Sequence, residues 1–240
     1  MIRQSTNYSG LLKLRRRIYQ WRGWYTIVTM KSKKNKRLLL VWNGMAARQV
    51  SGGDNYVEKL IRLSQDSFDI GGSSQASDLA QSKAVKQRYI TDGGVANGTL
   101  ALSWLYFKRC IKAWRLIAKN KTAYDGVLAS SPFMPDILPA IRKRTSNRAV
   151  IFFHLIPDRK GHDFRTKLRF FVARAEQKLS LLIIKRYFHV ILAGNVVVQA
   201  ELQKRFPNKK IVIAHAGINT KKIDDVTIDK KDNDLAVFVG

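Results

Sequence analysis

The sequence predicts an α/β fold in which helices cover both faces of one parallel sheet. Short apolar runs closed by turn residues alternate about six times with segments of helical periodicity, which is typical of parallel sheets. The first run, RLLLVWN at 37–43, is apolar at almost every position, as expected for a strand buried on both faces. No apolar run reaches the roughly 18–20 residues that span a bilayer. The single cysteine, Cys110, excludes a disulfide framework.

The other elements follow from the same two periodicities along the chain. We expect further strands at 68–73, 88–91, 126–129, 149–153, 188–193, 211–214 and 235–239. We expect helices at 54–64, 99–118, 136–143, 163–186 and 196–205. Residues 71–98, rich in Gly, Ser, Ala, Gln and Asp, form the most loop-like stretch. This succession predicts a Rossmann-like α/β domain.

The positive charge lies in two blocks. The 240 residues carry 44 Lys and Arg against 17 Asp and Glu, a net charge of +27. Residues 1–53 have 12 bases and no acid, and residues 137–222 have 19 bases against 4 acids. Such an excess predicts an anionic partner: a nucleic acid, an acidic membrane surface or a phosphorylated substrate.

Residues 1–36 form a basic N-terminal extension with two interpretations. Leu11, Leu14, Ile18 and Trp21 recur at near-helical spacing among arginines, a pattern that can lie in a membrane interface. Alternatively, translation starts at Met30 and residues 1–29 are upstream sequence or a loose tail.

The expected helix at 163–186 is amphipathic and also has two interpretations. Its apolar positions form one stripe: Phe164, Leu168, Phe171, Val172, Ala175, Leu179 and Leu182. The commoner explanation is a core-facing stripe below a solvated charged face. The alternative is docking on anionic lipid headgroups through the interleaved bases Arg165, Lys167, Arg169, Arg174 and Lys178.

In an open parallel sheet, ligands bind beyond the carboxyl ends of the strands, so the loops there hold the candidate site residues. After the first strand, Gly52 and Gly53 lead into a helix, where backbone N–H groups favour a phosphate. The alternative is an ordinary turn with Asp54 as the helix N-cap. His154 follows the strand at 149–153, where an imidazole can meet a ligand or serve a structural role. No residues have metal-ligand spacing.

The loop after the strand at 126–129 offers hydroxyl groups. Its Ser130 and Ser131 could hold a polar ligand. Ser131 could equally cap the next helix, with Pro132 at the first helical position. The two roles are compatible.

These motifs, in this order, resemble the amino-terminal half of family 4 glycosyltransferases. The resemblance rests on Gly52-Gly53, on SSPFMPD at 130–136, on HLIP at 154–157 and on FPNKKIVI at 206–213 followed by Gly217-Ile-Asn219. It covers roughly residues 37–240. Ala216-Gly217 replaces the Asn-Gly usual in the family, and Leu235–Gly240 resembles the strand that opens its second domain.

The resemblance implies a GT-B fold, in which two Rossmann-like domains face each other across a cleft and a sugar is transferred with retention of configuration. It implies that Gly52 and Gly53 contact the donor phosphates and that His154 acts at the reacting centre. It places four residues on the acceptor side: Ser130, Ser131, Phe133 and Arg159. It implies a nucleotide-sugar as co-substrate, with no metal and no resident cofactor.

The expected organisation is therefore a basic extension at 1–36, an acceptor-binding domain at 37–222, and a linker with the first strand of a second domain at 223–240. The donor-binding domain of the family does not follow within this sequence, so we expect these residues alone to be inactive in sugar transfer. The partners expected are a glycan or lipid-linked acceptor, an anionic membrane surface and a carboxyl-terminal domain or subunit in trans. We expect a cytoplasmic protein, peripheral on the inner face of the membrane.

The alternative function is a basic non-catalytic module that binds nucleic acid or recruits a catalytic partner to anionic membranes. The charge permits nucleic-acid binding, but no helix-turn-helix, RNA-recognition or zinc-finger signature supports it.

Overall fold

The computed structural model describes residues 36–44, 51–92, 94, 96, 98–155 and 164–214. These residues contain one seven-stranded, wholly parallel sheet with the strand order β3-β2-β1-β4-β5-β6-β7. The predicted Rossmann-like α/β architecture is therefore confirmed. The N-terminal extension, Arg159 and the expected strand at 235–239 lie outside the described residues.

Every element except α3 overlaps a segment of the same type expected from the sequence. The strands are β1 (Arg37–Trp42), β2 (Ser67–Gly72), β3 (Val85–Ile90), β4 (Gly126–Ala129), β5 (Arg148–Phe152), β6 (Val190–Ala193) and β7 (Lys210–Ile213). The helices are α2 (Gly52–Leu63), α3 (Ser74–Leu79), α4 (Thr99–Lys119), α5 (Met134–Arg142), α6 (Phe164–Tyr187) and α7 (Val196–Arg205).

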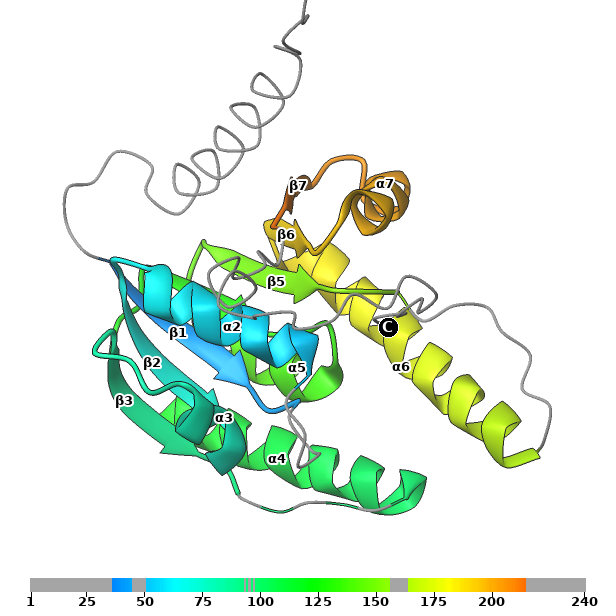
Figure 1. Ribbon diagram of the computed structural model, residues 1–240, viewed down its shortest axis with the longest axis horizontal. Helices are drawn as coiled ribbons and strands as arrows, with labels where there is room; N and C mark the ends of the chain where they lie inside the picture. The colour runs from blue at the N-terminus through cyan, green and yellow to red at the C-terminus, as the bar shows by residue number, and fades with distance from the viewer. Residues whose placement is uncertain are drawn as a thin grey trace, which may run out of the picture.

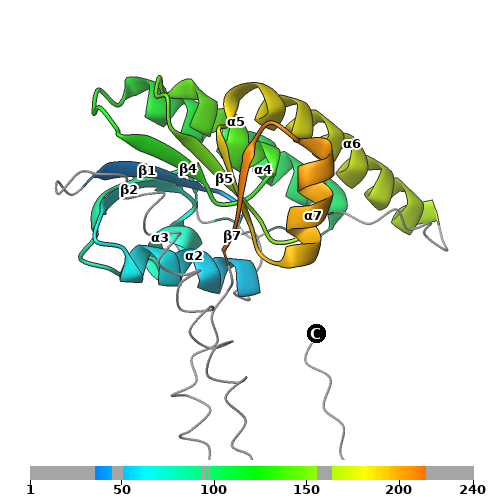
Figure 2. The ribbon, with the colours of Figure 1, turned by 90° about the horizontal axis from the view of Figure 1, so that it is seen from above.

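Helices cover both faces of the sheet. Helices α2 and α3 lie on one face, and α4, α5, α6 and α7 lie on the other, as Figure 1 and Figure 2 show from two directions. The packing agrees, because the buried side chains divide into two clusters. One joins Val57 and Ala76, of α2 and α3, to β1 and β2. The other joins Ile117, Ile137 and Ile184, of α4, α5 and α6, to the opposite side of the strands.

The loop-like interpretation of 71–98 is wrong for much of that stretch. It contains α3, and β3 begins at Val85, three residues before the expected start. Ser73 caps α3 by accepting a hydrogen bond from the N–H of Ala76. A six-residue helix is too short to show a clear apolar periodicity, so the sequence pattern gave no indication of α3.

Two expected helix caps are also wrong. Ser51, not Asp54, is the N-cap of α2, and Asp54 completes a capping box by accepting from the N–H of Ser51. At α5 the N-cap is Phe133, which makes no side-chain capping bond, and Pro135 stands in the first turn. Ser131 therefore is not the N-cap of α5. Its hydroxyl accepts from the N–H of Phe133 and donates to the side chain of Asp136 in α5.

The apolar stripe predicted to face the core on α6 is exposed. Phe171 and Leu182 are 70% and 65% exposed, and Val172 and Leu179 are also exposed. The helix buries Ser180 and Ile184 near its carboxyl end. Figure 1 shows that the amino-terminal half of α6, which holds Phe171 and Val172, extends beyond the carboxyl ends of the strands. Leu179 and Leu182 lie in the carboxyl half, on the side of the helix away from the buried Ser180 and Ile184.

Only part of the apolar face of α4 is buried. Ile117 is buried, and Leu102, Leu105 and Tyr106 are half-buried, but Ile111 and Trp114 are exposed. The buried face of this helix instead holds Arg109, whose side chain is 0% exposed.

Candidate functional site

The candidate site lies at the carboxyl edge of the sheet, around its topological switch point. Strand β1 has β2 on one side and β4 on the other. The chain leaves β1 toward α2 on one face, and it leaves β4 toward α5 on the opposite face. The loops after these strands therefore diverge, and such a point is where open α/β sheets bind ligands.

A buried polar network joins the two strand ends at this point. Asp136 of α5 accepts hydrogen bonds from the N–H of Asn43 at 2.5 Å and from the hydroxyls of Ser130 and Ser131 at 2.8 and 2.5 Å. The amide nitrogen of Asn43 donates to the carbonyl of Pro135 at 3.0 Å. The end of β1 is therefore fixed to the loop after β4.

Burial raises the pKa of Asp136 to about 6. Desolvation is the main cause, since the side chain is fully enclosed. The hydrogen bonds from Ser131, Asn43 and Ser130 oppose this shift because they favour the carboxylate. Gly44 lies directly over the network: a Cβ at this position would stand 3.5 Å from Asp136 Oδ2 and 3.6 Å from Ser131 Oγ.

Arg109 connects α4 to the same edge. Its guanidinium donates to Asp92 Oδ1 at 2.6 Å, to the carbonyl oxygens of Gly94 at 2.7 Å and Asn43 at 3.0 Å, and to Gln75 Oε1 at 3.4 Å. The planar fork of donors suits several acceptors at once. One side chain of α4 thereby holds the ends of β1 and β3.

Gly52 and Gly53 form the first turn of α2, where helix geometry leaves N–H groups without intrahelical acceptors. A Cβ on Gly53 would come within 3.0 Å of the Phe153 ring, whereas a Cβ on Gly52 would meet nothing within 4 Å. Phe153 also packs edge-on against Tyr56, with ring centroids 5.3 Å apart. The glycine turn therefore lies against the residue that precedes His154.

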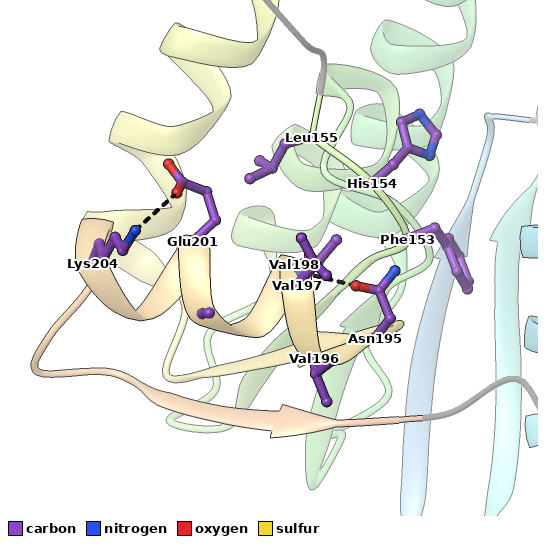
Figure 3. A pocket seen from close by; sticks show the side chains of 10 residues that line it. Phe153, His154, Leu155, Asn195, Val196, Val197, Val198, Glu201 and Lys204 are labelled. Atoms are coloured by element: carbon purple, nitrogen blue, oxygen red, sulfur yellow. Dashed lines mark hydrogen bonds and ion pairs between the residues drawn. The ribbon is translucent and has the colours of Figure 1, made fainter.

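His154 lines an open groove of about 700 Å³ with residues from the segments that follow β5 and β6 and from α7. The groove is lined by Phe153, His154, Leu155, Asn195, Val196, Val197, Val198, Ala200, Glu201 and Lys204. Figure 3 shows the imidazole and the side chain of Leu155 pointing in different directions from the end of β5. His154 is exposed, so its ring is accessible to a ligand.

Asn195 lines this groove at the start of α7. Its side-chain oxygen accepts from the N–H of Val198 at 2.8 Å, which makes it the N-cap of the helix (Figure 3). The amino terminus of α7 therefore opens toward the end of β5. The preceding Gly194 donates its N–H to the carbonyl of Phe152 at 2.7 Å, which keeps the two loops in contact.

The structure thus brings two groups of predicted residues to one edge. Gly53 and His154 adjoin through Phe153, and Ser130 and Ser131 meet in the Asp136 network. Phe133 is half-buried at the start of α5. On α6, Lys167 and Lys178 are exposed and Arg174 is half-buried, while the side chains of Arg165 and Arg169 lie outside the described set.

Sequence reasoning missed Asn43, Arg109 and Asn195. Asn43 closes an apolar strand, a position that itself indicates the carboxyl edge. Asn195 precedes a helix as an ordinary cap residue. Arg109 gave no signal, because it is one of five bases on α4.

The described residues offer neither a candidate metal site nor a helix that could cross a membrane. No group of three or more His, Cys, Asp or Glu side chains in 36–44, 51–92 and the later described ranges could hold a metal ion. Among the helices that the structure describes, none combines the length and apolar character needed to cross a membrane.

Comparison with solved structures supports the fold class. A UDP-glucosyltransferase from Polygonum tinctorium that glucosylates indoxyl, in complex with 3,4-dichloroaniline, matches 84% of this chain with a TM-score of 0.51 and 10% identity. The chain spans 56% of that enzyme. The fold is therefore the Rossmann-like α/β domain found in a glycosyltransferase.

Two further structures show weaker similarity. A UDP-N-acetylglucosamine 2-epimerase matches 75% of the chain at 14% identity, with a TM-score of 0.43 and 48% of its own length covered. The Bordetella bronchiseptica enzyme WbmF, in complex with NAD+ and UDP, matches 66% at 12% identity, with a TM-score of 0.34 and 48% of its length covered. No family model and no curated protein matches the sequence.

Proposed function

We propose that this chain is the acceptor-binding half of a retaining, family 4-like glycosyltransferase of GT-B fold. It takes part in moving a sugar from a nucleotide-sugar to a lipid-linked or membrane-proximal acceptor. A second domain or subunit binds most of the donor, and the described domain alone does not transfer sugar. The observation that carries the proposal is the convergence of Gly53, Phe153, His154 and Asn195 at one edge.

Donor phosphates bind at the start of α2. The N–H groups of Gly52 and Gly53 face the edge of the sheet, and the helix dipole favours negative charge there. Gly52 has open space around its Cα, so a phosphate can approach the backbone closely. The contact between Gly53 and Phe153 fixes this turn beside His154.

His154 contacts the transferred sugar. Its exposed imidazole stands at the rim of the groove and can donate a hydrogen bond to a sugar hydroxyl or to the leaving phosphate oxygen. The donor would lie partly above the groove, with its sugar between His154 and the acceptor. A hydrogen bond from His154 in this position strengthens as negative charge develops on the leaving group.

The acceptor side is the loop after β4. Ser130 and Ser131 donate to Asp136. Ser131 Oγ also accepts from the Phe133 N–H at 3.3 Å, and its second lone pair can accept from a hydroxyl of the sugar acceptor, while the buried Ser130 supports the loop from beneath. Phe133 offers a half-buried ring next to them, and Arg159 supplies a positive charge in the loop after β5. The α6 bases, including exposed Lys167 and Lys178, bring the domain close to anionic headgroups.

A transfer assay tests this proposal. The chain is combined with a carboxyl-terminal domain of a family 4 enzyme supplied in trans, radiolabelled nucleotide-sugars and source-cell membranes. We expect labelled lipid or glycan only when both parts are present, and a loss of at least 100-fold with His154→Ala.

His189→Ala is the matched control. His189 is also exposed, but it stands at the amino end of β6, where its N–H donates to Arg148. An active complex in which His154→Ala and His189→Ala behave alike would overturn the role of His154. Sugar transfer by the chain alone would contradict the proposal that a second domain or subunit is required.

A further inference from the structure

Helix α4 presents an aromatic stripe to solvent on the side away from the sheet. Trp104 and Phe107 are 58% and 54% exposed, and their rings stack with centroids 5.6 Å apart. The complete stripe has the spacing of one helical face: Leu100, Trp104, Phe107, Ile111 and Trp114. The opposite side of the helix buries Arg109, Ala113 and Ile117. The helix therefore places a polar anchor inside and its largest apolar side chains outside.

Bases border this stripe. Lys108, Lys112, Arg115 and Lys119 are exposed and share one flank by helical spacing. On the other side, the Arg142 guanidinium of α5 lies 5.5 Å from the centroid of the Trp114 ring. Between Asp92 and Asp125 the sequence contains six bases and no acid, so no carboxylate on the helix offsets this charge.

We propose that the outer face of α4, defined by Leu100, Trp104, Phe107, Ile111 and Trp114 with its flanking bases, docks on an anionic lipid surface. Tryptophan rings favour the level of the headgroups, and bases beside them attract anionic lipids. Lysine stems can lie along the apolar stripe while their charges reach the headgroups. The Lys108 ammonium already lies 5.3 Å from the centroid of the Trp104 ring.

The charge favours a membrane over a second copy of this chain. In a two-fold symmetric dimer formed through this face, the basic flank of one α4 would meet the basic flank of the other, which is repulsive. An anionic surface complements both the stripe and the flank. This inference rests on the membrane-proximal acceptor in the proposed function and assigns the main contact to α4 rather than to α6.

Vesicle co-sedimentation of the full chain tests the inference. Vesicles of phosphatidylcholine with 30% phosphatidylglycerol are compared with pure phosphatidylcholine. We expect binding to the anionic vesicles that weakens steeply with salt. Trp104→Ser/Phe107→Ser should weaken it about 30-fold, from the loss of roughly half the transfer free energy of each ring. Lys112→Glu/Lys119→Glu should weaken it at least about 30-fold, since each base contributes about a factor of five.

Matched controls come from other parts of the molecule. Leu63→Ser/Ile90→Ser removes two apolar side chains that are 52% and 46% exposed, on α2 and β3. Lys83→Glu/Lys86→Glu makes the same change in net charge at two exposed positions just before and within β3. Both controls should bind within about twofold of the unaltered chain.

Three outcomes would overturn the inference. Binding retained by both α4 variants would assign any lipid contact to another segment. Binding lost in Phe171→Ser/Leu182→Ser but kept in Trp104→Ser/Phe107→Ser would assign it to α6. A concentration-dependent dimer that the α4 variants abolish, without vesicle binding, would show a protein interface. Because the assay involves no sugar transfer, its failure is distinct from failure of the proposed function.

Discussion

Replacing Arg109 by methionine should remove the side chain that fixes α4 to the carboxyl edge. The guanidinium is fully buried and pairs with Asp92 at 2.6 Å. It also donates to the carbonyls of Asn43 and Gly94. Methionine has similar length but leaves the Asp92 carboxylate and these carbonyls without their donor. The Asp92 carboxylate is 30% exposed and can be hydrated once its partner is removed, so the loss is smaller than for a fully buried ion pair. We expect about 2–3 kcal/mol, mainly from the unpaired acceptors, out of the roughly 5–15 kcal/mol that stabilises a typical domain.

Urea unfolding followed by circular dichroism measures the change. Lys112→Met is the control, because it removes the same charge from an exposed position of the same helix and should change the free energy of unfolding by less than about 0.5 kcal/mol. Arg109→Lys should recover only part of the loss, since one ammonium cannot reach all the acceptors. If the free energies of unfolding of Arg109→Met and Lys112→Met differed by less than about 1 kcal/mol, the anchoring role of Arg109 would be refuted.

Three further predictions concern the candidate site and its partners. Gly72→Ala should lower the free energy of unfolding by several kcal/mol in the same urea assay, because the new Cβ would stand 2.2 Å from the Trp42 carbonyl oxygen. Gly52→Ala is the control, since a Cβ at that position would meet no atom within 4 Å. Since the pKa of Asp136 is raised from 3.8 to about 6, the folded state holds a proton that the unfolded chain releases, so stability should fall as pH rises from about 4 to about 6, by up to about 3 kcal/mol. Asp136→Asn should lessen that fall, and an unchanged profile would refute the burial argument. Finally, duplex DNA should bind weakly in a filter-binding salt titration, and tight, salt-steep binding without affinity for anionic vesicles would favour the nucleic-acid alternative.

The strands were predictable from sequence because their signal is local. The RLLLVWN run gives β1, and its burial on both faces follows from a parallel sheet with helices above and below. The positions of Gly52 and His154 at the same edge then follow from the direction of the strands. Each of these inferences needs only the neighbours of a residue along the chain.

The apolar faces of α4 and α6 could not be predicted, because periodicity shows that a stripe exists but not what covers it. Phe171 and Leu182 have the spacing of a core stripe, yet both are exposed. Phe171 lies where α6 extends past the sheet, and Leu182 lies on the side of the helix opposite the buried Ile184. Arg109 is equally hidden in sequence. Its burial depends on Asp92 and Asn43, which reach it only once the sheet is assembled.

The most direct test of the site is a titration of the isotope-labelled chain with nucleotide-sugars, followed by amide chemical shifts. UDP-glucose, UDP-N-acetylglucosamine and GDP-mannose provide the panel, and inorganic phosphate provides the reference. We predict that at least one nucleotide-sugar shifts the amide resonances of Gly52, Gly53, His154 and Asn195, and that those of Arg148 and His189 at the amino edge stay unchanged. Shifts confined to Arg148 and His189 at the amino edge would contradict this prediction.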